Sequence, residues 1–414
     1  MRATTLLRRL LSLPQLRVLD CRVDQGVLVV RVRPRWANPR CSGCGSKLPS
    51  HARGALATRD RRWRHLDLAG CQLELSYDVH WVNCADCGRV VEAVPWSSEA
   101  SARCTDEFDR QIAFLAQRCD KTAVTRLMRV SWRTVGRCVE REVRRQRPGD
   151  PLLGLRVIGV DELSYRKHHY YVTVVTDLVQ RRFVWGKDGK GAKSFEAFFE
   201  ALGPERCQEI EVVCMDMGKA YIKAVREKLP HAQIVFDRFH VQALVNAALD
   251  EVRRSEWRSV RGTPVARSVK GLRFALLKHP LNRTEAQRAT ISTLQQVNWP
   301  IYRGLLLSES FRDILDRRQV NVVRALLLKW CDWACRSRLP AFVRVSRTIR
   351  EFLDEIVAYV RWRVTNGPTE GLNNKARLAT RQAYGFHSAE ALLAMLELRC
   401  SGLQIDPVQK PVAA

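Results

Sequence analysis

Residues 155–162 read LRVIGVDE, and this nearly continuous apolar run predicts a strand that is buried on both faces. Two further runs of the same kind follow, IEVVCMD at residues 210–216 and AQIVFD at residues 232–237. Amphipathic helical patterns at residues 193–203 and 218–230 separate the three runs. Apolar strands that alternate with helices predict an α/β core.

Further elements accompany this core. The segments HYYVTVVTD (residues 169–177) and RRFVWGK (residues 181–187) predict two more strands at hairpin distance. From about residue 240 to residue 363 there is only helical periodicity, and residues 367–381 predict one closing helix. This order resembles a ribonuclease H-like fold with a large α-helical insertion, although many α/β domains share parts of it.

Acidic residues follow two of the apolar runs directly. Asp161 follows VIGV and Asp216 follows VVCM, so both are expected at the carboxyl end of a strand, where open α/β sheets place their sites. Glu370 lies in NGPTEGLNNKARLATR, in which Pro368 suits the first turn of a helix. Glu370 is therefore expected in that turn, and the residues that share its helical face are Asn373, Asn374 and Arg377.

These carboxylates suit a pair of divalent ions. Three carboxylates from two strand ends and one helix can hold two ions roughly 4 Å apart, as phosphoryl transfer on DNA requires. Oxygen ligands suit Mg²⁺, with Mn²⁺ as a substitute. The two Asn side chains, Lys375 and Arg377 are then candidates for holding phosphates. The alternative is structural, because a strand-end Asp often only caps a turn, and Glu162 competes with its neighbour Asp161.

Asp237-Arg-Phe-His240 follows the third apolar run. His240 is a candidate for contacting a phosphate or for assisting proton transfer, with Asp237 in support. The alternative is that Asp237 caps a helix and His240 packs beside it. The local pattern leaves both interpretations open.

Two Cys-x-x-Cys pairs, Cys41 with Cys44 and Cys84 with Cys87, indicate one structural Zn²⁺ ion. Each short turn lets two thiolates reach the same tetrahedral ion, and four thiolates leave no open position for catalysis. The gap between the pairs is longer than the common spacing, which allows a β-hairpin between them. The alternative is unliganded, buried Cys.

Residues 106–147 lose the strand pattern and suit a helix-turn-helix. Thr122 to Met128 predict the short second helix, and Ser131 is the expected cap of the third. The residues expected to face base edges are Ser131, Trp132, Arg133, Thr134 and Arg137, while the residues expected to follow phosphates are Arg141, Arg144 and Arg145. The alternative is an ordinary three-helix bundle with a solvated basic face.

The balance of charge points to a polyanionic partner. Lys and Arg total 70 against 43 Asp and Glu, a net charge of +27. Nucleic acid is the usual neutralising partner, although ribosomal and membrane-surface proteins share this signature. No apolar run is long enough to span a membrane and the N-terminus does not resemble a signal peptide, so a cytoplasmic protein is expected.

Four blocks of the sequence resemble the catalytic blocks of the ISL-three family of bacterial insertion-sequence transposases. These are VIGVDELSYRKHHYYVTVVTDL, VVCMDMGKAYIKAV, VFDRFHV and NGPTEGLNNKARLATRQAYGFHS. The resemblance implies a ribonuclease H-like fold, an N-terminal zinc finger at the two Cys pairs, and DDE carboxylates at Asp161, Asp216 and Glu370. It also implies metal-dependent cleavage at terminal inverted repeats, followed by strand transfer. Asp237 and His240 resemble an Asp-x-x-His signature of several transposase groups with helical insertions.

The expected α/β architecture therefore has a ribonuclease H-like core behind two small DNA-reading domains. A β-rich domain with a four-cysteine zinc finger is expected at residues 1–100 and a helix-turn-helix at 101–150, ending in a linker at 147–151. The ribonuclease H-like core is expected at residues 151–240 and 366–414, with the helical insertion at 241–365. The expected partners are terminal-repeat and target DNA, and a second copy in a homodimer or higher synaptic oligomer. A non-catalytic DNA-binding regulator and a nuclease that cuts without joining are the alternatives.

Overall fold

The computed structural model describes residues 3–11, 13, 15–147, 149–166, 170–263, 265–383 and 385–408. Pro148 of the expected linker and His169 of an expected strand lie outside these residues. The chain divides into two compact units, one made of residues 1–150 and 375–414 and the other of residues 151–374. Each unit is described by itself below.

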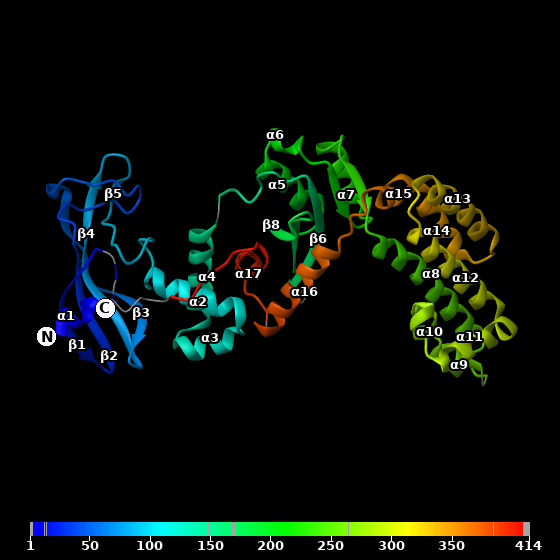
Figure 1. Cartoon of the computed structure of the whole chain (residues 1–414), viewed down its shortest axis with the longest axis horizontal. Coiled ribbons are helices and arrows are strands. Elements are labelled where there is room, and N and C mark those ends of the chain that lie inside the picture. Colours follow the sequence, from blue (N-terminus) through cyan, green and yellow to red (C-terminus); the bar gives the residue numbers. More distant parts are fainter. Residues whose placement is uncertain are drawn as a thin grey trace. The chain divides into compact units, whose positions relative to one another are not determined.

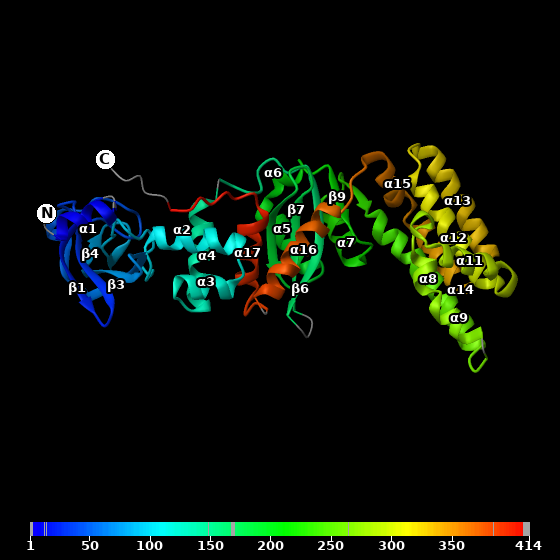
Figure 2. The same cartoon turned by 60° about the horizontal axis from the view of Figure 1, so that its bottom comes forward.

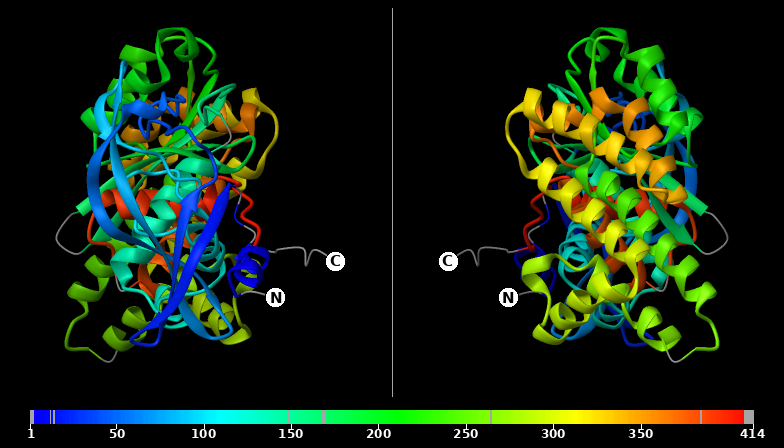
Figure 3. Two further views of the ribbon diagram at one scale, coloured as in Figure 1. Left: turned by 90° about the vertical axis from the view of Figure 1, so that its left-hand side faces the viewer. Right: turned by 90° about the vertical axis from the view of Figure 1, so that its right-hand side faces the viewer.

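The first unit begins with a five-stranded sheet of order β1-β2-β4-β3, in which β5 also pairs with β4. Gln25 and Gly26, both with positive φ, connect β1 and β2 in a tight turn of the kind that suits twisted hairpins. The left view of Figure 3 shows the long strands of this sheet. Its elements are α1 (Ala3–Leu11), β1 (Leu16–Asp24), β2 (Val27–Pro34), a 3-10 turn (Ser50–Ala52), β3 (Arg53–Leu68), β4 (Cys71–Cys84) and β5 (Gly88–Val91).

Alternation along the strands builds the core of this sheet. Val30 and Val32 of β2 are fully buried, whereas Arg31 and Arg33 between and beyond them face solvent. The inward side chains pack with Trp63, Trp96 and the apolar face of α1. The local pattern did not indicate α1 or β3, and both are held by these contacts with the rest of the sheet.

The helix-turn-helix of the first unit forms as the local pattern predicts. It consists of α2 (Asp106–Arg118), α3 (Lys121–Met128) and α4 (Trp132–Gln146). Ser131 caps α4 by accepting a hydrogen bond from the backbone N–H of Thr134 at 3.2 Å. A further helix, α17 (Ala389–Cys400), packs against α4, and Arg399 donates to the carbonyl oxygens of Ala116 and Cys119.

The second unit contains a mixed sheet of order β10-β9-β6-β7-β8. The first three strands in the chain, β6, β7 and β8, are antiparallel neighbours, while β9 and β10 add parallel strands beside β6. The elements are β6 (Val157–Arg166), β7 (Tyr170–Asp177), β8 (Arg182–Asp188), α5 (Ala192–Leu202), α6 (Pro204–Cys207), β9 (Val212–Met215), α7 (Lys219–Lys228) and β10 (Gln233–Phe236).

A helical region follows β10, as expected, and is visible in Figure 1 and in the right view of Figure 3. It shares one hydrophobic core with the sheet. Phe236 of β10 meets Phe352 at 5.4 Å between ring centroids. Its elements are α8 (Arg238–Ser259), α9 (Val265–Gly271), α10 (Arg273–Leu277), a 3-10 turn (Pro280–Asn282), α11 (Glu285–Val297), α12 (Trp299–Asp316), α13 (Val320–Arg336), α14 (Pro340–Glu351) and α15 (Leu353–Trp362).

The closing helix, α16 (Gly367–Gln382), begins directly against β6 and β7. Figure 2 shows it alongside β6. The Oγ1 atoms of Thr369 and Thr176 lie 2.5 Å apart, and Asn366 donates from Nδ2 to the Val160 carbonyl oxygen at 3.2 Å. Gly159 permits this approach, because a Cβ at that position would lie 2.5 Å from Thr369 Oγ1 and 2.6 Å from Asn366 Oδ1.

We expect Gly159→Ala to destabilise the second unit by about 1–3 kcal/mol, since the added methyl group overpacks a filled contact. A thermal unfolding scan should show a melting temperature lowered by several degrees. The matched control is Gly371→Ala, also near the start of α16, where nothing lies within 4 Å of the place that a Cβ would take. That variant should be neutral or more stable, because Ala favours helix. Equal melting temperatures of the two variants would contradict the close contact at Gly159.

Candidate functional site

Three aspartates lie on three neighbouring parallel strands. Asp216 follows β9 and Asp237 follows β10, but Asp161 lies within β6, which continues to Arg166 as the partner of β7, so the expectation that Asp161 ends a strand is wrong. Gly159 of β6 pairs with Cys214 of β9, so Asp161 and Asp216 stand at the same level, two residues further along each strand. The backbone N–H of Asp237, which follows β10, donates to the carbonyl oxygen of Met215 at 3.3 Å and continues the next ladder. Adjacent strands lie about 4.8 Å apart. The strand register therefore brings all three aspartates to one level of the sheet, where β9 and β10 end and β6 continues.

His240 lies above this level of the sheet, in the first turn of α8. Its Nε2 forms an ion pair with Asp216 Oδ1 at 3.0 Å. This contact, together with the negative charges of Asp216, Asp237 and Asp161, raises the pKa of His240 despite partial burial. Asp237 is buried and caps α8 by accepting from the Phe239 backbone N–H at 3.1 Å, and burial raises its pKa. The structure therefore shows the capping role for Asp237 and a carboxylate contact for His240.

Asp161 is held from two sides. Its Oδ2 accepts a hydrogen bond from Asn373 Nδ2 of α16 at 2.5 Å, and its Oδ1 accepts one from the Glu162 backbone N–H at 2.7 Å. The Glu162 side chain instead accepts from the Tyr221 hydroxyl at 2.8 Å. Burial raises the pKa of Tyr221 to about 12, so this phenol stays a donor. The two adjacent acids thus have different partners.

Glu370 occupies the first turn of α16, and its side chain is exposed. It lies one helical turn before Asn373, on the face that also carries Asn366. Among the described residues, the carboxylates of Asp161, Asp216 and Glu370 do not lie within 4.8 Å of one another as a group. The structure thus brings Asn373 to Asp161 and His240 to Asp216, and leaves Glu370 as the third acid on the adjoining helix. Asn374, Lys375 and Arg377 follow at exposed positions of α16.

The residues at this level of the sheet fit divalent cations. Carboxylate oxygens are the ligands that Mg²⁺ and Mn²⁺ prefer. Asp216 Oδ1 is buried and lies 3.0 Å from His240 Nε2, which holds this carboxylate in place. Asn366 Oδ1 is buried and has no partner within the described part of the chain, and it faces Gly159 of β6.

Sequence reasoning missed the residues that dock α16. Asn366, Thr369 and Asn373 are buried and face β6 and β7, and of these only Asn373 is among the predicted site residues, while Asn366 is predicted only as a possible helix cap. Their spacing of three and four residues marks one helical face, and this polar stripe was the available signal. Tyr221, which holds Glu162, carried no such signal because its partner is distant in the chain.

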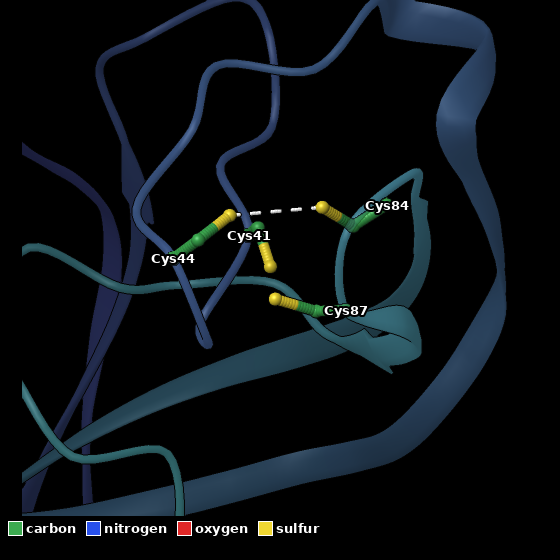
Figure 4. A group of neighbouring side chains, drawn as sticks. All are labelled: Cys41, Cys44, Cys84 and Cys87. Carbon is green, nitrogen blue, oxygen red and sulfur yellow. Dashed lines mark hydrogen bonds between the residues drawn. The ribbon is translucent and has the colours of Figure 1, made fainter.

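The four cysteines of the two Cys-x-x-Cys pairs come together in the first unit. Figure 4 shows the four side chains turned toward one another. Their Sγ atoms all lie within 4.8 Å of one another, and the Sγ atoms of Cys44 and Cys84 are 3.6 Å apart. Tetrahedral zinc with bonds of about 2.3 Å places its sulfur ligands roughly 3.8 Å apart. Each pair is followed by a glycine with positive φ, Gly45 or Gly88, which turns the chain back. The cluster is therefore compatible with one Zn²⁺ ion, and β3 and β4 form the hairpin between the pairs.

The arginines of α4 divide into exposed and engaged groups. Arg133 and Arg137, near its start, are exposed, and Arg144 is 68% exposed while contacting Glu99. Arg141 donates both Nε and Nη2 to the buried Asp109, at 2.7 and 2.6 Å. Arg145 contacts Asp106 and the buried Glu142. Arg141 and Arg145 thus stabilise the packing of α4 on α2, and the start of α4 carries the free basic surface.

We expect the wild-type chain to contain about one Zn²⁺ per molecule and the Cys44→Ser variant to contain none. Removing one thiolate opens a closed site, and metal affinity in such small domains contributes directly to folding. Metal analysis and circular dichroism with and without chelator are the measurements. The control is Cys71→Ser, an exposed cysteine outside the cluster, which should retain its zinc. Full zinc content in Cys44→Ser would contradict the four-thiolate site.

Comparison with known proteins agrees with these arrangements. A family model of DDE type, described as a transposase, matches residues 158–396, and the helix-turn-helix domain of transposase family ISL3 matches residues 92–143. The transposase for insertion sequence element IS1557 of Mycobacterium tuberculosis is 37% identical over 403 residues, or 92% of this chain and 90% of the relative. The transposase for IS1001 of Bordetella parapertussis is 27% identical over 366 residues, or 88% and 89%. The chain therefore belongs to the ISL3 family of insertion-sequence transposases, with a helix-turn-helix domain and a DDE domain.

Proposed function

We propose that this chain binds the terminal inverted repeats of its element, and that it cuts and joins DNA at Asp161, Asp216 and Glu370. The observation that carries the proposal is the register of β6 and β9, which puts Asp161 and Asp216 side by side at one level of the sheet. The start of α16 is docked against the same strand. Two acids at one level of adjacent strands and a third on the neighbouring helix form the set of carboxylates that metal-dependent phosphoryl transfer uses.

The proposed fold of the second unit is ribonuclease H-like. Three antiparallel strands followed by two parallel strands, with a helical insertion before the closing helix, support this assignment. Order and pairing of elements are the basis for it, together with the membership of a DDE family. The five expected domain segments of the whole chain are part of the same proposal.

Asp161, Asp216 and Glu370 would hold two Mg²⁺ or Mn²⁺ ions. When bound, such ions lower the pKa of the attacking water or 3′-hydroxyl and stabilise the leaving oxygen. Asn373 orients Asp161 through its 2.5 Å hydrogen bond, and His240 fixes Asp216 through the 3.0 Å contact. Each neighbour limits the rotamers of its carboxylate, so the ligand oxygens are positioned before DNA arrives.

Exposed groups near these acids are suited to the DNA backbone. Asn374, Lys375 and Arg377 extend along α16 beyond Glu370 and are assigned to phosphates of the transposon end or the target. His240 is assigned a supporting role, since it contacts Asp216 at 3.0 Å and lies beside the acids that would hold the ions. Two element ends must be held at once for joining, so we infer a homodimer or a higher synaptic oligomer.

Recognition of the repeat is assigned to the start of α4. Ser131 is used as the cap, and Arg133 and Arg137 in the first two turns are exposed. Trp132, Arg133, Thr134 and Arg137 are the proposed base-reading set.

Among the described residues, no helix has the length and apolar character that crossing a lipid bilayer requires.

The Arg133→Ala variant tests the base-reading assignment. If Arg133 makes a bidentate contact with a base, its loss should reduce discrimination between repeat and random DNA by about 1–3 kcal/mol. Arg144→Ala should instead weaken binding to both DNAs equally and reduce the dependence of the affinity on salt. Fluorescence anisotropy with both duplexes over a range of salt distinguishes the two patterns. An equal loss on both DNAs for Arg133→Ala would make that residue a phosphate contact.

Asp161→Asn, Asp216→Asn and Glu370→Gln test the catalytic assignment. Each keeps the side-chain size and removes one negative charge, so each should retain repeat binding and slow cleavage and joining by roughly a thousandfold or more. The measurement is cleavage and joining of labelled element ends into a target plasmid with Mg²⁺. Because the three acids act as one unit, the double variant Asp161→Asn with Glu370→Gln should be hardly worse than either single variant.

The matched control is Glu162→Gln. Its side chain contacts Tyr221 and points away from the partners of Asp161, so most activity should remain. If Glu162→Gln is inactive while Asp161→Asn cuts normally, the assignment of the acid on β6 is wrong. Normal joining by all three principal variants would place the chemistry elsewhere. Cut ends without joined product from the wild-type chain would instead favour a nuclease that only cuts.

A further inference from the structure

A basic cavity of about 860 Å³ lies in the first unit, beside the hairpin of β1 and β2. The start of α1, both strands and the segment after β2 line it. We call it the arginine cavity and define it by Arg8, Arg17, Arg33, Arg35 and Arg53. No acidic side chain of the described residues lines it.

Most of these arginines lack a carboxylate partner within the described part of the chain. Arg53 is the exception, because its Nη2 donates to Glu92 Oε2 at 2.7 Å and Glu92 is fully buried. Arg35 donates from Nε to the Leu16 carbonyl oxygen at 3.1 Å, which orients the guanidinium without neutralising it. The cavity therefore concentrates positive charge instead of balancing it.

The strand register makes this charge costly for the chain alone. Arg17 and Arg33 are directly opposite each other in the β1–β2 ladder. Like charges at such positions destabilise a sheet. Elsewhere in the same hairpin the arginines are paired, Arg31 with Asp78 at 3.0 Å and Arg22 with Asp60 at 3.8 Å. The contrast within one hairpin indicates that an anion from outside compensates Arg17 and Arg33.

The remaining groups around the cavity are suited to phosphate. Guanidinium groups bind phosphate oxygens in pairs. Thr4 and Thr5, in the first turn of the nine-residue α1, also line the cavity, where the helix end favours an anion. Trp36 adds an Nε1 donor that is buried and has no partner among the described residues. Small-molecule sites of this size are mainly apolar, whereas five of the twelve residues that line this cavity are arginines, which favours a polymeric anion.

We propose that the arginine cavity binds the phosphate backbone of DNA, as a contact separate from the helix-turn-helix. Both modules belong to the same compact unit. The backbone of Arg64 in β3 exchanges hydrogen bonds with Arg103 and Thr105 at the start of α2, at 2.8 and 3.0 Å. The β-sheet domain and the helix-turn-helix are therefore joined by main-chain hydrogen bonds. Phosphate contacts position a protein on DNA without reading sequence, so the cavity contributes affinity and not specificity.

The test is the salt dependence of DNA binding by the full chain with Arg17→Ala and Arg33→Ala combined. Each phosphate contact contributes about 0.9 to the slope of log affinity against log salt. The double variant should lose about 2 from this slope, and roughly ten- to a hundredfold in affinity near 0.1 M salt, equally on repeat and random duplexes. The binding assay needs no divalent metal, so its outcome is independent of the catalytic assignment.

The matched control combines Arg22→Ala with Arg31→Ala, which removes two arginines of the same strands that already have carboxylate partners. Its slope should equal that of the wild-type chain. Without DNA, the Arg17 and Arg33 double variant should melt at the same or a higher temperature, because a repulsive pair is gone. That result separates lost contacts from lost folding.

Two results would overturn the proposal. One is an unchanged slope in the Arg17 and Arg33 double variant, and the other is an equal loss of slope in the control. If the slope is unchanged and tripolyphosphate binds to the wild-type chain but not to the double variant, the cavity is assigned to a small polyphosphate.

Discussion

The parallel pairing of β6 with β9 is the constraint on which the candidate active site depends. Main-chain hydrogen bonds between these strands set a register in which Gly159 stands opposite Cys214. Asp161 and Asp216 then emerge at the same level of the sheet without any direct attraction between them, and their like charges oppose the arrangement. The buried strands hold the two acids together against this repulsion, because a shift of register would disrupt their main-chain hydrogen bonds and the close packing of their buried side chains.

The third acid depends on a different contact. Glu370 lies outside the sheet, and its position follows from the docking of α16 on β6 and β7. Gly159 and the hydroxyls of Thr176 and Thr369 allow the helix to approach closely. Asn366 and Asn373 on the same helical face then contact the Val160 carbonyl and Asp161. A small residue in a strand and a polar stripe on a helix together control the geometry of the proposed metal ligands.

The arginines of the first unit fall into two groups. Those paired with acids are structural, and those without an acidic partner in the described part of the chain are the candidates for binding DNA. Arg141 and Arg145 are engaged with the acids of α2 and α4, so they stabilise the helix-turn-helix. Arg133, Arg137 and the arginine cavity carry positive charge that no acid of the described residues neutralises, apart from the pairing of Arg53 with Glu92. A chain with a net charge of +27 repels itself. These basic groups therefore mark the surfaces where DNA would relieve that repulsion.

The sequence by itself determined the features that depend on neighbours in the chain. Apolar runs predicted β6, β9 and β10, Ser131 predicted the start of α4, and the spacing of the cysteines predicted the four-cysteine cluster. It did not reveal α1, β3 or α17. The strand β3 is rich in arginine and the helix α17 is apolar on several sides, so neither of these two elements has a clear periodicity. Only the tertiary structure decided which strands are neighbours, how α16 approaches Gly159, and that Arg17 faces Arg33. These depend on hydrogen bonds and packing between residues far apart in the chain, which no local pattern records.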